Sequence, residues 1–135
     1  MNVPFKILGI DYIEFIVGNA KQAAHYYHSQ LGFTPFAYSG LETGERDKVS
    51  YGVRQNKIVF ILTSPLMANS ALNVHLMQHG DGVRDVAFTV DNAAAAWEYA
   101  IRNGARSYMR PEEQTDEDGS IIRAAIRTYG DTIHT

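Results

Sequence analysis

Tyr12, Glu14 and Asp85 are polar side chains that stand at alternating positions in two otherwise apolar segments. Alternate positions of a strand share one face, so these side chains could line a common surface. On that surface the oxygens of these side chains could bind a cation weakly. Alternatively, the three side chains could form a hydrogen-bonded network, because buried carboxylates need partners. We favour the network. Tyrosine is a poor metal ligand at neutral pH, since its pKa is about 10.

His75 and His79 form an H-x-x-x-H pattern, which on a helix would place both imidazoles on one face. We expect residues 64–81 to be a loop between two halves of the chain. A loop does not enforce the spacing of the two histidines, and short motifs often match by chance. A structural or solvated role is therefore favoured over metal binding.

The other candidate residues give weaker indications of a metal-binding or catalytic site. His25 and His28 are expected on the surface of a helix, and we expect His134 to face the same side as Tyr12, without a second histidine opposite. An acidic run invites a calcium interpretation, but its spacing does not match the alternating ligands of an EF-hand loop. A solvated hairpin is the better prediction for this run, whose members are Glu112, Glu113, Asp116, Glu117 and Asp118.

An internal repeat organises the elements that carry these residues. GIDYIEFIVGNA begins at Gly9 and GVRDVAFTVDNA begins at Gly82. Each copy predicts a strand that runs into a helix, and a repeat of this kind fixes the architecture. Asn19 is a suitable N-cap for the first helix, and Gly32 is a suitable C-terminal stop.

The remaining patterns complete two similar halves. In the first, Ala20, Ala24, Tyr27 and Leu31 form the buried stripe of the helix. In the first strand of each half, one face is apolar and the other is mixed, and the apolar face should meet the helix. The predicted strands cover 9–17, 33–38, 48–54, 58–63, 83–90, 106–111 and 121–129, with a last one from Thr132; the helices cover 19–31 and 91–103, and 111–120 forms an acidic hairpin loop.

These elements predict an α+β fold in which two βαβββ modules form a curved eight-stranded half-barrel with the helices outside. We expect one domain, residues 1–135, with module 1 at about 8–66, a linker loop at 67–80 and module 2 at about 81–135. The last strand should be truncated, because strands usually run about 5–6 residues. Its incomplete pairing would leave a sheet edge that invites association.

Composition excludes several classes of protein. The 135 residues carry a net charge of −3, which gives no basis for binding nucleic acid or an anionic membrane. There is no cysteine, so disulfides and thiolate chemistry are excluded. No apolar run approaches the roughly 20 residues of a membrane helix. With no signal-peptide layout at the N-terminus, we expect a cytoplasmic protein.

The two-module arrangement resembles the vicinal oxygen chelate (glyoxalase/bleomycin resistance/dioxygenase) fold. Longer motifs are more specific: ETGERDKVSYGVRQNKIVFILTSPL, HGDGVRDVAFTVDNAAAAWEYAIRNGA and RTYGDTIHT are similar to the N-terminal domain of 4-hydroxyphenylpyruvate dioxygenases. That family consists of Fe(II)-dependent non-haem dioxygenases of tyrosine catabolism, which convert 4-hydroxyphenylpyruvate and O2 to homogentisate and CO2.

The resemblance implies that iron is held by two histidines and a glutamate of the C-terminal domain. Tyr12 and Asp85 would occupy the places of the two histidines here, as degenerate ligand positions. It therefore implies no catalytic, cofactor-binding or metal residue in this chain. The expected partners are the protein's own C-terminal catalytic domain and further copies in a homo-oligomer, with a structural role for this chain.

Three alternatives stay open. The chain could be the N-terminal domain of a hydroxymandelate synthase, a related branch that uses the same substrate. It could be a stand-alone protein of the same fold that binds a small molecule. It could also be a homodimeric metalloenzyme, although that requires histidines where Tyr12 and Asp85 stand.

Overall fold

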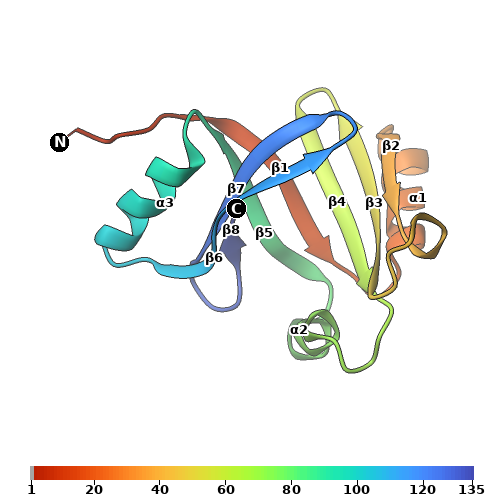
Figure 1. Cartoon of the computed structure of the whole chain (residues 1–135). Coiled ribbons are helices and arrows are strands. Elements are labelled where there is room, and N and C mark those ends of the chain that lie inside the picture. Colours follow the sequence, from red (N-terminus) through yellow and green to blue (C-terminus); the bar gives the residue numbers. More distant parts are fainter. Residues whose placement is uncertain (1) are drawn as a thin grey trace. The chain divides into compact units, whose positions relative to one another are not determined.

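The computed structural model describes residues 2–135, which form eight β-strands and three α-helices (Figure 1). This confirms the predicted α+β class. The elements in chain order are β1 (Ile7–Ile16), α1 (Ala20–Leu31), β2 (Thr34–Ser39), β3 (Lys48–Gln55), β4 (Ile58–Pro65), α2 (Ala71–His79), β5 (Gly82–Val90), α3 (Ala93–Arg102), β6 (Arg106–Asp116), β7 (Gly119–Arg127) and β8 (Ile133–His134), with a short 3-10 turn at Leu41–Thr43.

The chain divides into two compact units. One is continuous and covers Tyr12–Arg84, and the other combines the segment up to Asp11 with Asp85–Thr135. We call them the continuous unit and the discontinuous unit. The first residues of β1 thus belong with the second half of the chain, where the Lys6 N–H donates to Asp91 Oδ1 at 2.8 Å and the Asp91 N–H donates to the Lys6 carbonyl at 3.2 Å.

The continuous unit builds its core between a sheet and α1. Its strands lie in the order β2-β3-β4-β1, with β1 and β4 parallel and the other neighbours antiparallel. The helix packs against β2, β3 and β4. Phe15 of β1 packs against the core, as the alternation predicts, and ring contacts of 5.1–5.3 Å surround Phe60. The buried core residues are Val17, Ala20, Ala24, Phe33, Val53 and Leu62.

The discontinuous unit has strands in the order β5-β8-β7-β6, with α3 packed against β6 and β7. The two-residue strand β8 pairs parallel with β5, where Asp85 faces Ile133, and antiparallel with β7, where Ile126 faces His134. A strand with a neighbour on each side is not an edge. The prediction that the last strand leaves an open sheet edge is therefore wrong.

Both α1 and α3 begin where the repeat predicts. The Asn19 side chain accepts a hydrogen bond from the Gln22 N–H at 3.0 Å, and Asn92 accepts one from the Ala95 N–H at 3.0 Å. Each cap satisfies a backbone donor that the first helical turn leaves without a partner. The first helix ends at Gly32, whose φ of 77° is accessible to glycine at little cost.

The segment between the halves corrects the sequence interpretation. Residues 64–81 were expected to be a loop, but α2 forms within them. Ser70 caps this helix by accepting from the Asn73 N–H at 3.1 Å, and the Gly80 N–H bonds to the Leu76 carbonyl at 2.8 Å. The helix was missed because it is short and mixes polar with apolar residues, so its periodicity is weak.

Two other expectations about elements were wrong. Strand β6 continues to Asp116, so most of the acidic segment 111–120 is paired strand rather than loop. Leu31 was expected on the buried stripe of α1 but is 48% exposed, because the buried surface of that helix is made by Ala20 and Ala24 nearer its start.

Burial on β5 also differs from the predicted pattern. Val86 and Phe88 were expected to provide the strongly apolar, helix-facing side, yet both are only half-buried. The buried residues are Asp85 and Ala87, on the other face. They lie on the same face as Ile133, because Asp85 and Ile133 are paired across the strands. The face predicted to be mixed therefore contributes to the core of its unit.

Candidate functional site

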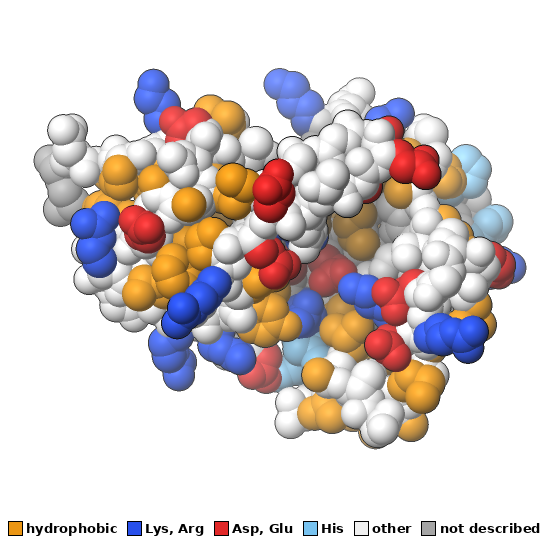
Figure 2. All heavy atoms as spheres, in the orientation of Figure 1, with side chains coloured by type: hydrophobic (Ala, Val, Ile, Leu, Met, Phe, Trp, Pro, Cys, Tyr) orange, Lys and Arg blue, Asp and Glu red, His pale blue; other side chains and the backbone are white. Residues whose placement is uncertain are grey.

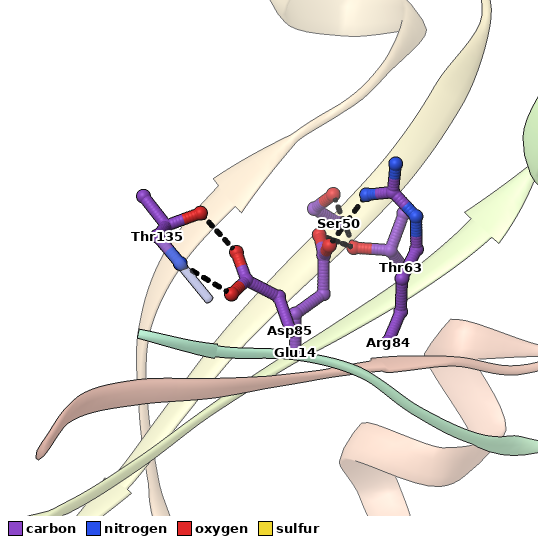
Figure 3. A network of polar contacts seen from close by, with 6 residues as sticks. All are labelled: Glu14, Ser50, Thr63, Arg84, Asp85 and Thr135. Atoms are coloured by element: carbon purple, nitrogen blue, oxygen red, sulfur yellow. Dashed lines mark hydrogen bonds and ion pairs between the residues drawn. The ribbon is translucent and has the colours of Figure 1, made fainter. Parts of the chain in front are cut away.

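Asp85 is the most buried charged residue that the structure describes, at 2% exposure. Its Oδ1 accepts a hydrogen bond from the Thr135 N–H at 3.0 Å, and its Oδ2 accepts one from the Thr135 hydroxyl at 2.5 Å (Figure 3). Burying a carboxylate is costly unless hydrogen bonds compensate it. Both oxygens therefore hold the end of the chain beside β5, in register with the Asp85–Ile133 pair.

Glu14 is the centre of a second polar group, within the continuous unit (Figure 3). Its Oε2 accepts a hydrogen bond from the Thr63 hydroxyl at 3.0 Å, and the Thr63 and Ser50 hydroxyl oxygens are 2.8 Å apart. Arg84 lies 3.4 Å from Glu14 Oε1, with side chains 19% and 15% exposed. The arrangement pairs a partly buried carboxylate with one cation and one hydroxyl, which is a hydrogen-bonded network rather than a nucleophile with a base.

The sequence predicted a hydrogen-bonded network of Tyr12, Glu14 and Asp85, but not the residues that bond to Glu14 and Asp85. Each carboxylate has partners inside its own unit, and Tyr12 is a half-buried residue of β1. Thr63, Ser50 and Thr135 were missed. The pairing of Ser50 with Thr63 across β3 and β4 is the signal that could have found two of them, because both are hydroxyl residues in apolar strands.

The structure places the histidines differently from the expectation in two cases. His134 was expected to face the same side as Tyr12. Its Nδ1 lies 2.9 Å from the Val86 carbonyl, and its ring lies 5.1 Å from the ring of Phe88, on the opposite face of β5 from Asp85. His75 and His79 lie on α2 rather than on a loop, with ring centroids 4.7 Å apart.

The remaining candidates lie where they were expected. His25 and His28 are exposed on α1, and the Nδ1 atom of His28 is 2.7 Å from the Phe33 carbonyl. The acidic run is an exposed hairpin, whose turn is closed when Asp116 Oδ1 accepts from the Asp118 and Gly119 N–H groups at 2.9 and 3.1 Å. The carboxylates of this hairpin therefore either stabilise the turn or lie on strands that face solvent.

A surface groove of about 600 Å³ lies beside α1 in the continuous unit. Its wall is mainly aromatic and aliphatic, and its one carboxylate, Asp81, accepts a hydrogen bond from the Gly18 N–H at 2.9 Å. The groove contains no pair of acid and base side chains, so it offers shape and apolar contact rather than catalysis. Its lining residues are Phe15, Val17, Asn19, Gln22, Ala23, Tyr26, Tyr27, Leu62, Asp81 and Gly82.

The sequence of this chain matches a known protein family. The family described as "Hydroxyphenylpyruvate dioxygenase, HPPD, N-terminal" matches residues 1–134. The chain belongs to this family. The resemblance seen in the three sequence motifs is thereby confirmed.

Curated relatives of this HPPD N-terminal chain are dioxygenases. The 4-hydroxyphenylpyruvate dioxygenase of Caenorhabditis elegans is 50% identical over 129 residues, which cover 95% of this chain and 33% of that protein. The corresponding enzyme of Xenopus tropicalis is 45% identical over 131 residues, which cover 96% and 33%. The chain therefore spans about a third of the length of these relatives.

Solved structures agree with the fold of the HPPD N-terminal family. A variant of 4-hydroxymandelate synthase from Streptomyces coelicolor superimposes with a TM-score of 0.90 at 26% identity, covering 95% of this chain and 37% of that one. Methylmalonyl-CoA epimerase from Mycobacterium tuberculosis gives a TM-score of 0.77 at 17% identity, covering 99% and 89%. At that identity the second likeness shows the fold alone.

Two further findings concern metals and membranes. Among residues 2–135, no cluster of three or more His, Asp or Glu side chains is arranged to hold a metal ion. Within the same described part of the chain, no helix is both long and apolar enough to span a bilayer.

Proposed function

We propose that this chain is the N-terminal, non-metal-binding domain of an Fe(II)-dependent 4-hydroxyphenylpyruvate dioxygenase, which converts 4-hydroxyphenylpyruvate and O2 to homogentisate and CO2. The observation that carries the proposal is the 50% identity to the Caenorhabditis elegans dioxygenase across 95% of this chain. In the proposal, iron and catalysis belong to a C-terminal domain. The cytoplasmic location expected from the sequence is part of the same proposal.

In the part of the chain that the structure describes, the residues do not fit an iron site. Non-haem iron sites of this type use two histidines and one carboxylate, and in the proposal Tyr12 and Asp85 are the degenerate counterparts of the two histidines. A phenol is a poor match for that donor set. The two Asp85 oxygens already accept hydrogen bonds from Thr135. Asp85 is thus suited to fixing the fold, and no reaction step is assigned to this chain.

The proposed role is support of the catalytic domain and of contacts between copies in a homo-oligomer. Several large apolar side chains of the discontinuous unit are exposed, including Ile7, Leu8, Ile121 and Ile122 at 57–64%. Figure 2 shows hydrophobic side chains gathered on the surface around α3. Exposed apolar patches often mark protein–protein contact sites, which favours the proposed contacts with the catalytic domain and with further copies.

A hydroxymandelate synthase is the second candidate, because the likeness to the Streptomyces coelicolor enzyme has a TM-score of 0.90. The identity to that enzyme is 26%, whereas the identity to the curated dioxygenases is 43–50%. The identities favour the dioxygenase. The stand-alone alternatives have less support, since the likeness to the free-standing epimerase is one of fold.

The test uses the open reading frame that encodes this chain, read to its own stop codon and expressed whole. The purified protein is loaded with Fe(II) and supplied with 4-hydroxyphenylpyruvate and O2, and the product is identified. We expect homogentisate. Formation of 4-hydroxymandelate would instead establish the synthase, and a frame that stops after Thr135 with no turnover would contradict both.

The same protein tests the role of Asp85. We expect Asp85→Asn to lower the free energy of unfolding by about 1–3 kcal/mol, because one oxygen that accepts from Thr135 becomes a donor. Iron content and turnover per folded protein should stay near the native values. Glu117→Gln, at an exposed hairpin position, is the control. Loss of iron from a fully folded Asp85→Asn protein would show that Asp85 is a ligand.

A further inference from the structure

His75 and His79 are one helical turn apart on α2, and their rings face one another. The ring centroids are 4.7 Å apart and the ring planes are inclined at 53°. Side chains at positions i and i+4 of a helix lie one above the other. The structure thus enforces a spacing that a loop would have left undefined.

We propose that His75 and His79 form a binding site for a divalent transition-metal ion, of the class of Cu²⁺ or Zn²⁺. Neutral imidazole nitrogens suit these ions, whereas Mg²⁺ and Ca²⁺ prefer oxygen ligands. Two protein ligands leave the other coordination positions to water or to a small ligand. Cu²⁺ should bind more tightly than Zn²⁺, following the general order of affinity for nitrogen ligands.

The backbone holds the pair in place at both ends of α2. Ser70 caps the start of the helix, Asn73 Nδ2 donates to the Ala68 carbonyl at 2.8 Å, and the Gly80 N–H bonds to the Leu76 carbonyl at 2.8 Å. The helix also packs against β4. A site on a fixed helix loses less conformational freedom on binding an ion than one on a loop.

The position is accessible. His79 is exposed and His75 is half-buried, and Figure 2 shows histidine side chains at the surface beside α2. The proposal is independent of the dioxygenase assignment, because it concerns α2 and neither Tyr12 nor Asp85. It also predicts a site of modest affinity, since among residues 2–135 no third ligand completes a cluster.

The experiment titrates the chelator-treated protein with Cu²⁺ alone and with Zn²⁺ alone, using calorimetry for affinity and electron paramagnetic resonance for the ligands of Cu²⁺. We expect one Cu²⁺ ion beyond any held at the proposed iron site of the C-terminal domain, with a spectrum that shows two coordinated imidazole nitrogens. His79→Gln should weaken binding by at least about tenfold and leave a single-nitrogen spectrum, because it removes one ligand of the pair.

His25→Gln is the matched control, since it also removes one exposed histidine from a helix. It should leave affinity and spectrum unchanged. Circular dichroism reports whether each variant keeps its helix content. His79 is the residue substituted because it is exposed, whereas His75 is half-buried. Equal binding by the native protein and His79→Gln, or equal loss in His25→Gln, would refute the site.

Discussion

The Tyr38 hydroxyl donates a hydrogen bond to the Glu42 carboxylate, four residues along the chain. This bond is the main reason why the pKa of Tyr38 is raised to about 12, and the same bond lowers the pKa of Glu42. The phenol is favoured in its protonated form while the carboxylate is ionised. The pair lies at the surface, so it bears on titration behaviour more than on stability.

The titration of Tyr38 gives a prediction with a definite sign. A raised pKa means that the bond contributes fully below the ordinary tyrosine pKa of about 10 and is lost as the pH rises through about 12. The tyrosinate absorbance of the native protein minus that of Tyr38→Phe should therefore show a midpoint near 12. In a Glu42→Gln background the midpoint should fall towards 10. A native midpoint already at 10 would contradict the contact.

At single residues, the sequence predicted what depends on near neighbours. Asn19 was identified as a cap because a cap bonds within its own helical turn, and Asn92, its counterpart in the repeat, caps α3 in the same way. The bonds from Thr63 to Glu14 and from Thr135 to Asp85 join residues 49 and 50 positions apart. No local pattern determines such pairs, because they depend on which strands become neighbours.

Among the elements, strands and helices with strong periodicity were predicted, and α2 was not. The repeat located β1, α1, β5 and α3 because each copy combines alternation, an asparagine cap and a helical stripe. Helix α2 has nine residues and a weak apolar pattern, so packing against β4 rather than its own sequence determines it. Consequently the sequence alone could not place His75 and His79 on one face of a helix, and only the folded structure shows that they lie together.

The cap of α1 provides the prediction at this scale. Asn19→Ala should lower the free energy of unfolding by about 0.5–2 kcal/mol, because the Gln22 N–H loses its partner. Asn19→Ser should retain most of the stability, since a serine oxygen can accept the same bond. Urea unfolding of the three proteins measures the difference. Equal destabilisation by alanine and serine would mean that the asparagine acts through something other than capping.

For the molecule as a whole, stability depends on a few buried side chains. Leu62 is 1% exposed in the core of the continuous unit, whereas Leu31 is 48% exposed. Leu62→Ala should cost about 2–5 kcal/mol, because it leaves a cavity in a close-packed region. Leu31→Ala should change stability by about 0.5 kcal/mol or less. Chemical unfolding measures both, and similar costs for the two would show that Leu31 is buried in solution.

The discontinuous unit has a consequence for biosynthesis. A ribosome completes residues 12–84 while the second half is still unmade, so the continuous unit can fold as soon as it emerges. The segment up to Asp11 cannot, because Lys6 has to wait for Asp91, 85 residues later. During that interval the backbone of the N-terminal segment lacks its partner at Asp91, and its N–H and carbonyl groups are open to chaperones or to other nascent chains. The segment that is synthesised first is thus among the last to adopt its folded position.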